Sequence, residues 1–524
     1  MSDGRRSAPF ATETVLAPTG SESVALDRSA IDTVGVPQPV LLENAGRSAA
    51  QVLSRLFPSG PVVGLIGGGN NGGDALVLLR TLKAWGRDVE AVIVADRSTS
   101  DTLLHGWDVT ALPDTSLGEA EWARILGFAS VVVDGLLGTG VRGMPRDRQA
   151  AVIRRVNESG CPVLSIDVPS GIDSETGAVP GEAMSASVTV AFGAPKLGSL
   201  LSPARERVGR LVAVEIGFPP WDDESVTAQV ITPRWAHRRL PARSVDTHKN
   251  AVGRVTIIAG QPGMGGAAVL ATRAAFAGGA GLVRVCSAAE NRELLQQAVP
   301  EAIYVDAADR DAVEAALDQS DSVALGPGLG TGEDAADVVR LVAGGPSRPL
   351  VVDADALNLA AEGIVDLKAV AESRSVLATP HAGEMSRLLA VTKAEVIADR
   401  VAALGAGVSL LGHAVLLKGV PSLVLAPGGR VLIDTQGTSD LAVAGMGDTL
   451  TGVCGALLAQ GASALDAGAV GLYLTGRAAR IAGRGVSLTP SDVIRWLPEA
   501  LLESPSVESA LDLPFVIFDA EAPR

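Results

Sequence analysis

Short apolar runs that end in a polar or glycine-rich turn and lead into a helix recur throughout the chain. One of them, residues 61–66, is followed by the turn GGGNNGGD at 67–74 and by a helical stretch at 75–85. Similar runs lie at 89–95, 130–134, 163–167, 210–216, 253–260, 282–286, 322–325, 349–353, 375–379 and 414–418. Strands that alternate with helices in this way form a mostly parallel sheet with helices on both faces. The pattern therefore predicts an α/β fold.

The chain is too long for a single core of this kind. It has 524 residues, more than the length at which chains divide into separate domains. Between the two sets of strands lies a stretch rich in Pro and Arg, residues 230–246, which reads as a connection. Ahead of the first strand, residues 26–56 read as two helices broken at 35–37. We therefore predict two domains, residues 1–224 and 225–524.

Charge and composition limit the kinds of partner that the protein can bind. The formal charge of −16 and the pI of about 4.9 argue against nucleic acid, whose phosphates require clustered Lys and Arg. No run is long and uncharged enough to span a membrane, and the first residues lack the apolar core of a signal peptide. Three widely separated cysteines in apolar surroundings indicate neither a disulfide framework nor a zinc site. We expect a cytoplasmic protein that binds small molecules, and its helices of small residues favour a homo-oligomer.

A turn near the C-terminal end, residues 445–448, is a candidate catalytic centre. Gly445 and Gly447 carry no Cβ where the chain enters a helix, so backbone N–H groups can converge on a phosphate with help from the helix dipole. Asp448 follows in the first helical turn, where a carboxylate can act as a base toward a hydroxyl beside a transferring phosphoryl group. The string alone is equally compatible with a glycine-rich loop and an ordinary first-turn acid. Other motifs have to decide between these interpretations.

Polar residues follow three apolar runs of the first half. The turn after the first run contains Asn70, Asn71 and Asp74, and the later runs end at Asp134 and Asp167. Amide and carboxylate oxygens can bind a hard cation or the polar groups of a ligand. One such acid alone would more readily be a helix cap. Three at the carboxyl edge of one sheet favour a ligand site, since open α/β sheets bind ligands there.

Several motifs of the first half together resemble the NAD(P)H-hydrate epimerase domain: LLENAGR at 41–47, GGGNNGGD at 67–74, VDGLLGTG at 133–140, DVPSG at 167–171 and VAFGAPKLG at 190–198. The resemblance implies a Rossmann-like α/β/α sandwich that interconverts the R and S epimers of hydrated NADH and NADPH (NADHX and NADPHX). It implies an acid/base role for Asp167 and a potassium ion held by Asn71, Asp134 and Ser170. Lys196 is either a phosphate contact or a surface lysine. The residues implied to contact the hydrated dinucleotide are Asn70, Asn71, Gly72, Gly73, Asp74, Gly138, Thr139, Gly140, Val141, Arg142, Gly143, Met144 and Asp167.

The loops after the second-half strands also carry polar or glycine-rich sets that could form one site. Taken singly, these residues are ambiguous. His381 is more readily a hydrogen-bonded structural histidine than a catalyst, and Lys418 is either a surface lysine or a cation that neutralises phosphate. Asp353 and Asp355 are either acids that face magnesium or helix caps, and a cap is favoured for Asp355.

Six motifs of the second half, taken in order, resemble the ribokinase-like NAD(P)H-hydrate dehydratase domain: HKNAVGRVTIIAG at 248–260, GPGLG at 326–330, DADALN at 353–358, TPHAGE at 379–384, KGVPS at 418–422 and GMGD at 445–448. The resemblance implies dehydration of the S epimer to NADH or NADPH with ADP or ATP as co-substrate and Mg²⁺ as cofactor. Phosphoryl transfer would turn the ring hydroxyl into a good leaving group, with Asp448 as the base. The implied contacts are Ala267, Gly328, His381 and Asp448 to the hydrated dinucleotide, and Lys418, Gly419, Val420, Pro421, Ser422 and Gly447 to the adenine nucleotide. The chain has AGMGD and TPHAGE where that family usually has GGTGD and TPHPGE.

The motifs together predict a bifunctional repair enzyme in which the epimerase supplies the dehydratase. Two other interpretations stay open. A small-molecule kinase could use the same glycine-rich turn, and it would accumulate a stable phosphorylated product. The first half could also be a module that binds a nucleotide without catalysis.

Overall fold

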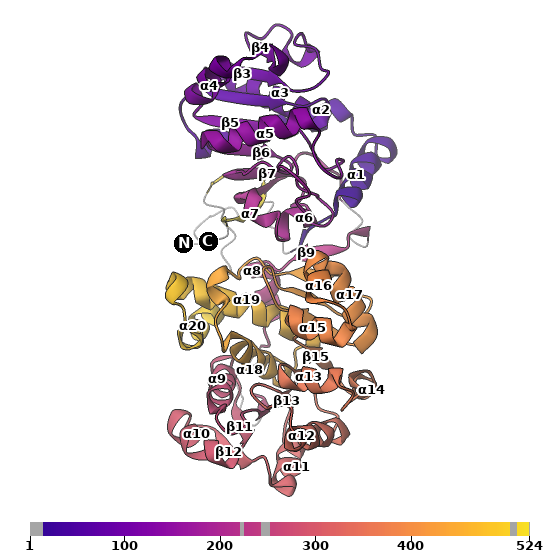
Figure 1. Cartoon of the computed structure of the whole chain (residues 1–524), viewed down its shortest axis with the longest axis vertical. Helices are drawn as coiled ribbons and strands as arrows, with labels where there is room; N and C mark the ends of the chain where they lie inside the picture. Colours follow the sequence, from indigo (N-terminus) through magenta and orange to yellow (C-terminus); the bar gives the residue numbers. More distant parts are fainter. Residues whose placement is uncertain (1–13, 221–224, 243–251, 504–510, 523–524) are drawn as a thin grey trace, which may run out of the picture. The chain divides into compact units, whose positions relative to one another are not determined.

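The chain folds into two α/β units. The computed structural model describes residues 14–220, 225–242, 252–503 and 511–522 (Figure 1). One unit comprises Met1–Val230 with Val507–Arg524, and the other comprises Ile231–Ser506. Each is built on a mostly parallel sheet, which confirms the predicted fold class. Residues 248–251 of the second-half motif lie outside the described residues.

The first unit contains a sheet in the order β19-β8-β7-β6-β5-β2-β3-β4, parallel throughout except for β19. The strands are β2 (Val62–Ile66), β3 (Val89–Ile93), β4 (Thr110–Pro113), β5 (Val131–Gly135), β6 (Val163–Ile166), β7 (Val188–Phe192), β8 (Arg210–Val214) and β19 (Val516–Ala520). Strand β1 (Val15–Leu16) pairs antiparallel with β9 (Ala228–Val230) and is not part of this sheet.

Helices cover both faces of this sheet because successive strand residues point to opposite sides. Val62 and Ile66 of β2 belong to one core, formed with α2 and α3. Val63 and Leu65 belong to a second core, formed with α4 and α5. The helices of the unit are α1 (Gly20–Arg28), α2 (Gln38–Leu56), α3 (Asn70–Ala84), α4 (Glu119–Phe128), α5 (Asp147–Ser159), α6 (Leu197–Leu200) and α7 (Arg205–Val208). The predicted break at 35–37 is confirmed, since Gly35 has a φ of 84° and α2 begins after Pro37.

The last strand of the chain belongs to the first unit, which differs from the predicted division at residues 224 and 225. Strand β19 pairs antiparallel with β8, more than 300 positions earlier in the sequence. Asp519 of β19 accepts two hydrogen bonds from Arg210, at 2.8 and 2.7 Å. The strand therefore covers what would otherwise be an exposed edge of the sheet.

We expect Asp519→Ala to destabilise the first unit. The guanidinium of Arg210 is mostly buried and would lose two charge-assisted hydrogen bonds. Such a loss lowers the free energy of unfolding by about 2–3 kcal/mol. The unfolding midpoint of a unit of this size then falls by about 5–10 °C. Calorimetry on the full chain measures the shift. The control is Glu521→Ala, because Glu521 is 64% exposed and lies 3.7 Å from Arg210; an equal shift in both variants would contradict this account.

The second unit contains strands in the order β18-β17-β16-β15-β14-β13-β10-β11-β12. They are parallel except at β17 and β18, which are antiparallel to their neighbours. Their bounds are β10 (Arg254–Ile258), β11 (Leu282–Ser287), β12 (Ile303–Asp306), β13 (Ser322–Leu325), β14 (Leu350–Val352), β15 (Val376–Ala378), β16 (Ala414–Leu417), β17 (Leu423–Leu425) and β18 (Val431–Ile433).

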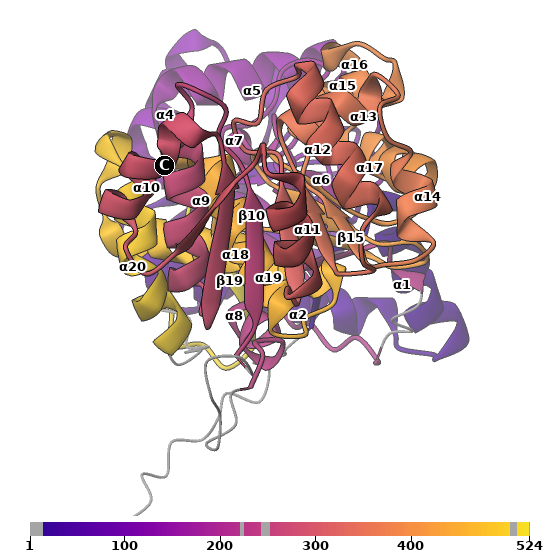
Figure 2. The same cartoon turned by 90° about the horizontal axis from the view of Figure 1, so that it is seen from below.

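Helices also lie on both sides of this sheet. Figure 2 shows α9 and α10 on one side of β10, and α11 and α12 on the other. The helices are α8 (Pro233–Arg238), α9 (Gly265–Ala277), α10 (Arg292–Ala298), α11 (Arg310–Asp318), α12 (Glu333–Gly344), α13 (Asp355–Ala361), α14 (Leu367–Ala371), α15 (Ala382–Leu389), α16 (Lys393–Ala398), α17 (Arg400–Leu411), α18 (Met446–Ala459), α19 (Ala464–Ala482) and α20 (Pro490–Leu502). No helix in the described ranges is long and apolar enough to cross a membrane.

Small residues fix the position of α18 against α9. A Cβ on Gly452 would lie only 2.1 Å from the carbonyl oxygen of Ala271, so glycine is required for this approach. Gly445 precedes the helix with a φ of 90°, a backbone conformation that favours glycine. The close packing and the turn together set where the first residues of α18 lie, including Asp448.

Candidate active sites

A cavity of about 960 Å³ opens at the carboxyl ends of the strands in the first unit. Loops after β2, β5 and β6 line it, together with residues of α1 and α2. Of the residues implied for the hydrated dinucleotide, those in the lining are Asn70, Asn71, Asp74, Gly138, Thr139, Gly140, Val141, Arg142, Met144 and Asp167. Gly72 and Gly73 are buried in α3 instead. A Cβ on Gly72 would lie 2.1 Å from the carbonyl oxygen of Gly67, so this glycine serves the close approach of helix and turn.

Asp167 and Lys196 form a buried ion pair in this cavity. Asp167 directly follows β6 with a φ of 65°, an uncommon conformation for a residue other than glycine. Its Oδ1 accepts hydrogen bonds from Lys196 Nζ at 2.5 Å and from the backbone N–H of Phe192 at 3.1 Å. Lys196 is 2% exposed, and its Nζ also donates to the carbonyls of Phe192 and Ala194. The surface-lysine interpretation of Lys196 is therefore wrong, because its ammonium is the counter-ion of Asp167.

The three residues implied as potassium ligands lie close together, linked through Leu137. Asp134 is fully buried and accepts hydrogen bonds from the hydroxyls of Ser165 and Ser170 and from the backbone N–H groups of Leu136 and Ser170. Burial raises the pKa of Asp134, although these bonds act in the opposite direction. Asn71 Nδ2 donates to the carbonyl of Leu137 at 2.7 Å, and Leu137 N donates to Ser170 Oγ at 2.9 Å. The cluster consists of oxygen-rich groups around a buried carboxylate whose hydrogen-bond donors are all neutral.

Two acidic residues of the cavity have strongly altered proton affinities. Burial raises the pKa of Asp27, on α1, to about 6; Lys196 opposes the shift and Asp167 adds to it. Burial raises the pKa of Asp74 well above its usual range, and the negative charges of Asp167 and Asp27 contribute. Asp27 cannot be recognised from the sequence, because a single acid on a helix carries no distinguishing motif.

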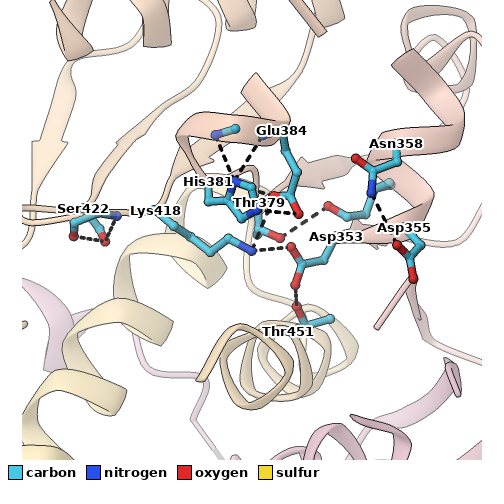
Figure 3. Close-up of polar contacts among 12 residues, drawn as sticks. Asp353, Asp355, Asn358, Thr379, His381, Glu384, Lys418, Ser422 and Thr451 are labelled. Carbon is cyan, nitrogen blue, oxygen red and sulfur yellow. Dashed lines mark hydrogen bonds and ion pairs between the residues drawn. The ribbon is translucent and has the colours of Figure 1, made fainter. Parts of the chain in front are cut away.

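A buried network joins the strand ends of the second unit, as Figure 3 shows. Lys418, after β16, donates from Nζ to Asp353 Oδ1 at 2.6 Å, and Thr451 Oγ1 of α18 donates to Asp353 Oδ2 at 2.7 Å. Glu384 Oε2 lies 3.8 Å from the same Nζ. Burial would raise the pKa of Asp353, but Lys418 and the hydrogen bonds outweigh it and hold this pKa below its ordinary value. Burial would lower the pKa of Lys418, but the charges of Asp353 and Glu384 raise it overall.

Asp448 lies close to this network, in the first turn of α18. Burial raises its pKa to about 6; the charge of Asp353 adds to the shift, and Lys418 opposes it. Gly447 brings the helix start against the ion pair, since a Cβ there would lie 3.4 Å from Lys418 Nζ and 3.6 Å from Asp353 Oδ2. The structure therefore combines a carboxylate whose pKa is raised to about 6 with a glycine-rich helix start, the arrangement a base for phosphoryl transfer needs.

The expected helix cap at Asp355 is wrong. Asp355 is the first residue of α13, after Ala354 in the cap position, and its Oδ2 accepts a hydrogen bond from the backbone N–H of Gly330 at 2.8 Å. The carboxylate is thus directed to the GPGLG loop. Gly328 of that loop approaches Ala267 of α9, since a Cβ on Gly328 would lie 3.0 Å from the Ala267 Cβ.

His381 has the structural role that the sequence favoured. It is the N-cap of α15, and its Nδ1 accepts hydrogen bonds from the backbone N–H groups of Gly383 and Glu384 at 2.9 and 3.1 Å. Its side chain is 53% exposed. The contact to the dinucleotide implied by the resemblance stays a prediction.

Arg400, on α17, supports the loop at 418–422. Its Nη2 donates to the carbonyls of Leu417 and Lys418 at 3.3 Å and of Pro421 at 3.0 Å. A Cβ on Gly419 would lie 2.2 Å from Arg400 Nη1, so the loop passes directly over the guanidinium. Arg400 cannot be recognised from the sequence, because it lies outside the KGVPS motif.

Within the described ranges, no group of three or more His, Cys, Asp and Glu side chains is arranged to hold a metal ion.

Comparisons with known proteins find a matching family for each half of the chain. The family model described as NAD(P)H-hydrate dehydratase matches residues 255–499, and the one described as YjeF-related protein N-terminus matches residues 38–198. The bifunctional NAD(P)H-hydrate repair enzyme of Moorella thermoacetica is 34% identical, over 92% of this chain and 96% of its own. That of Escherichia coli (strain K12) is 34% identical over 87% of each chain. The crystal structure of ADP/ATP-dependent NAD(P)H-hydrate dehydratase from Bacillus subtilis, co-crystallized with ATP/Mg²⁺, is 26% identical and covers 51% of this chain and 96% of its own, with a TM-score of 0.45. The chain therefore belongs to the family of bifunctional NAD(P)H-hydrate repair enzymes.

Proposed function

We propose that the protein restores hydrated NADH and NADPH in two steps, one in each unit. The first unit interconverts the R and S epimers, and the second dehydrates the S epimer with ADP or ATP as phosphoryl donor. The observation that carries this proposal is that each unit has an aspartate whose charge interacts with a lysine that follows a strand: Asp167 is paired with Lys196, and Asp448 lies near Lys418. Family membership over nearly the whole chain supports the assignment of substrates.

In the epimerase unit, Asp167 is the proposed proton-transfer group. Lys196 holds the Asp167 carboxylate in one orientation at the cavity wall. The cavity volume is at the upper end of the range for small-molecule sites, as a dinucleotide requires. The polar groups of Asn70 and Asp74 and the loop at 138–144 would bind and orient the ligand.

A potassium ion fits the cluster of Asn71, Asp134 and Ser170. These residues supply amide, carboxylate and hydroxyl oxygens, the donors that hard cations prefer. The charge of Asp134 is buried among neutral donors, so a monovalent cation would compensate it. When bound, the ion would supply a positive charge that compensates the buried carboxylate of Asp134.

In the dehydratase unit, Asp448 is the proposed base. It would accept the proton of the ring hydroxyl while the backbone N–H groups of 445–447 hold the transferring phosphoryl group. The pair of Lys418 and Asp353 would position the helix start, and the loop at 418–422 would contact the adenine nucleotide. Mg²⁺ takes most of its oxygens from phosphates and water and needs only one or two carboxylates, so it fits this site together with the nucleotide, whose charge it would neutralise.

Purified protein mixed with the R epimer of hydrated NADH and ADP tests the proposal. We expect dihydronicotinamide absorbance to recover faster than spontaneous epimerisation allows, with AMP and inorganic phosphate formed in equal amounts. A small-molecule kinase would instead leave a stable phosphorylated product and no recovered NADH. A non-catalytic first unit would leave the recovery limited by the spontaneous rate of epimerisation.

A cytoplasmic location and a homo-oligomeric state stay predictions.

A further inference from the structure

Epimerisation of the hydrated ring needs two proton transfers. Water adds to a dihydropyridine at the carbon next to the ring nitrogen, because the nitrogen lone pair stabilises positive charge there. Inversion at this carbon breaks its bond to the hydroxyl oxygen and forms a new bond to water on the opposite face. The departing hydroxyl must gain a proton, and the arriving water must lose one. A single carboxylate held by a lysine serves one of these transfers.

Asp27 is placed to serve the other. It lies on α1, whereas Asp167 follows β6, and both side chains line the same cavity. Asp27 is half-buried, and its carboxyl group interacts with the charges of both Lys196 and Asp167. Lys196 cannot turn toward Asp27 freely, since its ammonium donates to Asp167 and to two carbonyls.

The surroundings favour a proton on Asp27. Burial raises its pKa to about 6, so about half of Asp27 is protonated at pH 6 and about one tenth at pH 7. Asp74, whose pKa burial also raises, adds a third carboxyl group to the same cavity. The other charged residues that line the cavity are Arg28, Asp32, Asp96, Arg142 and Arg146. The cavity therefore pairs a carboxylate held by a lysine with a carboxyl group whose proton affinity is raised by burial.

Resting on the proposed epimerase activity, we propose that Asp27 is a second catalytic residue, the acid that protonates the departing ring hydroxyl. As the carbon–oxygen bond breaks, the hydroxyl leaves as water and the ring nitrogen forms a double bond to the carbon. Water then adds to the opposite face and gives its proton to Asp167. One proton has moved from Asp27 to Asp167, and exchange with water in the cavity restores both groups. The reverse conversion uses the same pair with exchanged roles.

The test is the pH dependence of epimerisation in full-length variants. In the unmodified protein, kcat/KM for the R epimer should fall as pH rises above about 6, because less Asp27 carries a proton. Asp27→Asn should lower the rate at pH 6 at least about 100-fold and remove this alkaline decline. Asp27→Glu should keep part of the rate and the decline. Glu158→Gln, an exposed change on α5 outside the cavity, is the control and should match the unmodified protein.

Two results would overturn the proposal. One is an Asp27→Asn rate within about threefold of the unmodified protein, and the other is a reduced rate that keeps the same pH dependence, which would indicate a purely structural role. Dehydration of the S epimer, measured on the same samples, should be unchanged in every variant. If the unmodified protein does not exceed the spontaneous epimerisation rate, the proposed function of the first unit fails instead.

Discussion

Asp448→Asn is expected to lower dehydration of the S epimer about 1,000-fold, within the range that a general base contributes, while ADP still binds. The amide keeps the size of the side chain but cannot accept the hydroxyl proton. The glycine-rich helix start and the network of Lys418, Asp353 and Thr451 do not depend on this carboxylate. The rate is measured by recovery of dihydronicotinamide absorbance, and ADP affinity by calorimetric titration.

The pH dependence of the same reaction gives a second view of Asp448. A base acts when deprotonated, and burial raises the pKa of Asp448 to about 6. The kcat/KM for the S epimer should therefore rise with pH, reach half of its maximum near pH 6 and level off above it. In Asp448→Asn the remaining activity should lack this rise.

Asp334→Asn is the matched control, since it makes the same change in the first turn of another helix, α12, at an exposed position. It should leave both the rate and the pH profile unchanged. Near-normal dehydration in Asp448→Asn would remove the assignment of the base. Loss of ADP binding together with activity would show that Asp448 acts mainly in the fold of the nucleotide site.

Asp167→Asn is expected to reduce conversion of the R epimer to the spontaneous rate, a loss of at least about 100-fold, and to leave dehydration of the S epimer unchanged. The variant removes the negative partner of Lys196, whose side chain is 2% exposed. Breaking a buried ion pair by removing one partner lowers the free energy of unfolding by about 3–5 kcal/mol. The first unit should therefore also unfold at a lower temperature.

The double variant Asp167→Asn with Lys196→Met separates these two effects. Without the unpaired ammonium, much of the stability should return, because a buried ion pair can often be replaced by apolar groups without loss. Epimerisation should stay at the spontaneous rate. Recovery of epimerase activity in the double variant would show that Asp167 matters only for the fold.

The positions of most strands could be predicted from the sequence, because a buried parallel strand is a short continuous apolar run bounded by turn residues. The run at 322–325, for example, is β13. The role of β19 could not be predicted in this way. Its partner β8 lies in the other half of the chain, and a local pattern carries no information about such a distant pairing.

The candidate sites were predictable where strand ends bring several polar residues together. The edge after β14 and β16 does unite Asp353 with Lys418, but their ion pair depends on side-chain directions that spacing does not reveal. The sequence favours a cap at Asp355 and cannot reveal its hydrogen bond to Gly330, because that bond depends on the distance between two loops. Asp27 and Arg400 were missed since each is a single residue on a helix without a motif.

We propose that two active sites, centred on Asp167 and Asp448, act in sequence on a substrate that leaves the first before it enters the second. Mixing the Asp167→Asn and Asp448→Asn proteins tests this proposal most directly. With the R epimer and ADP, neither variant alone should recover NADH above its spontaneous limit, whereas the mixture should recover it at a rate near that of the unmodified protein. A mixture no faster than the better single variant would contradict the account.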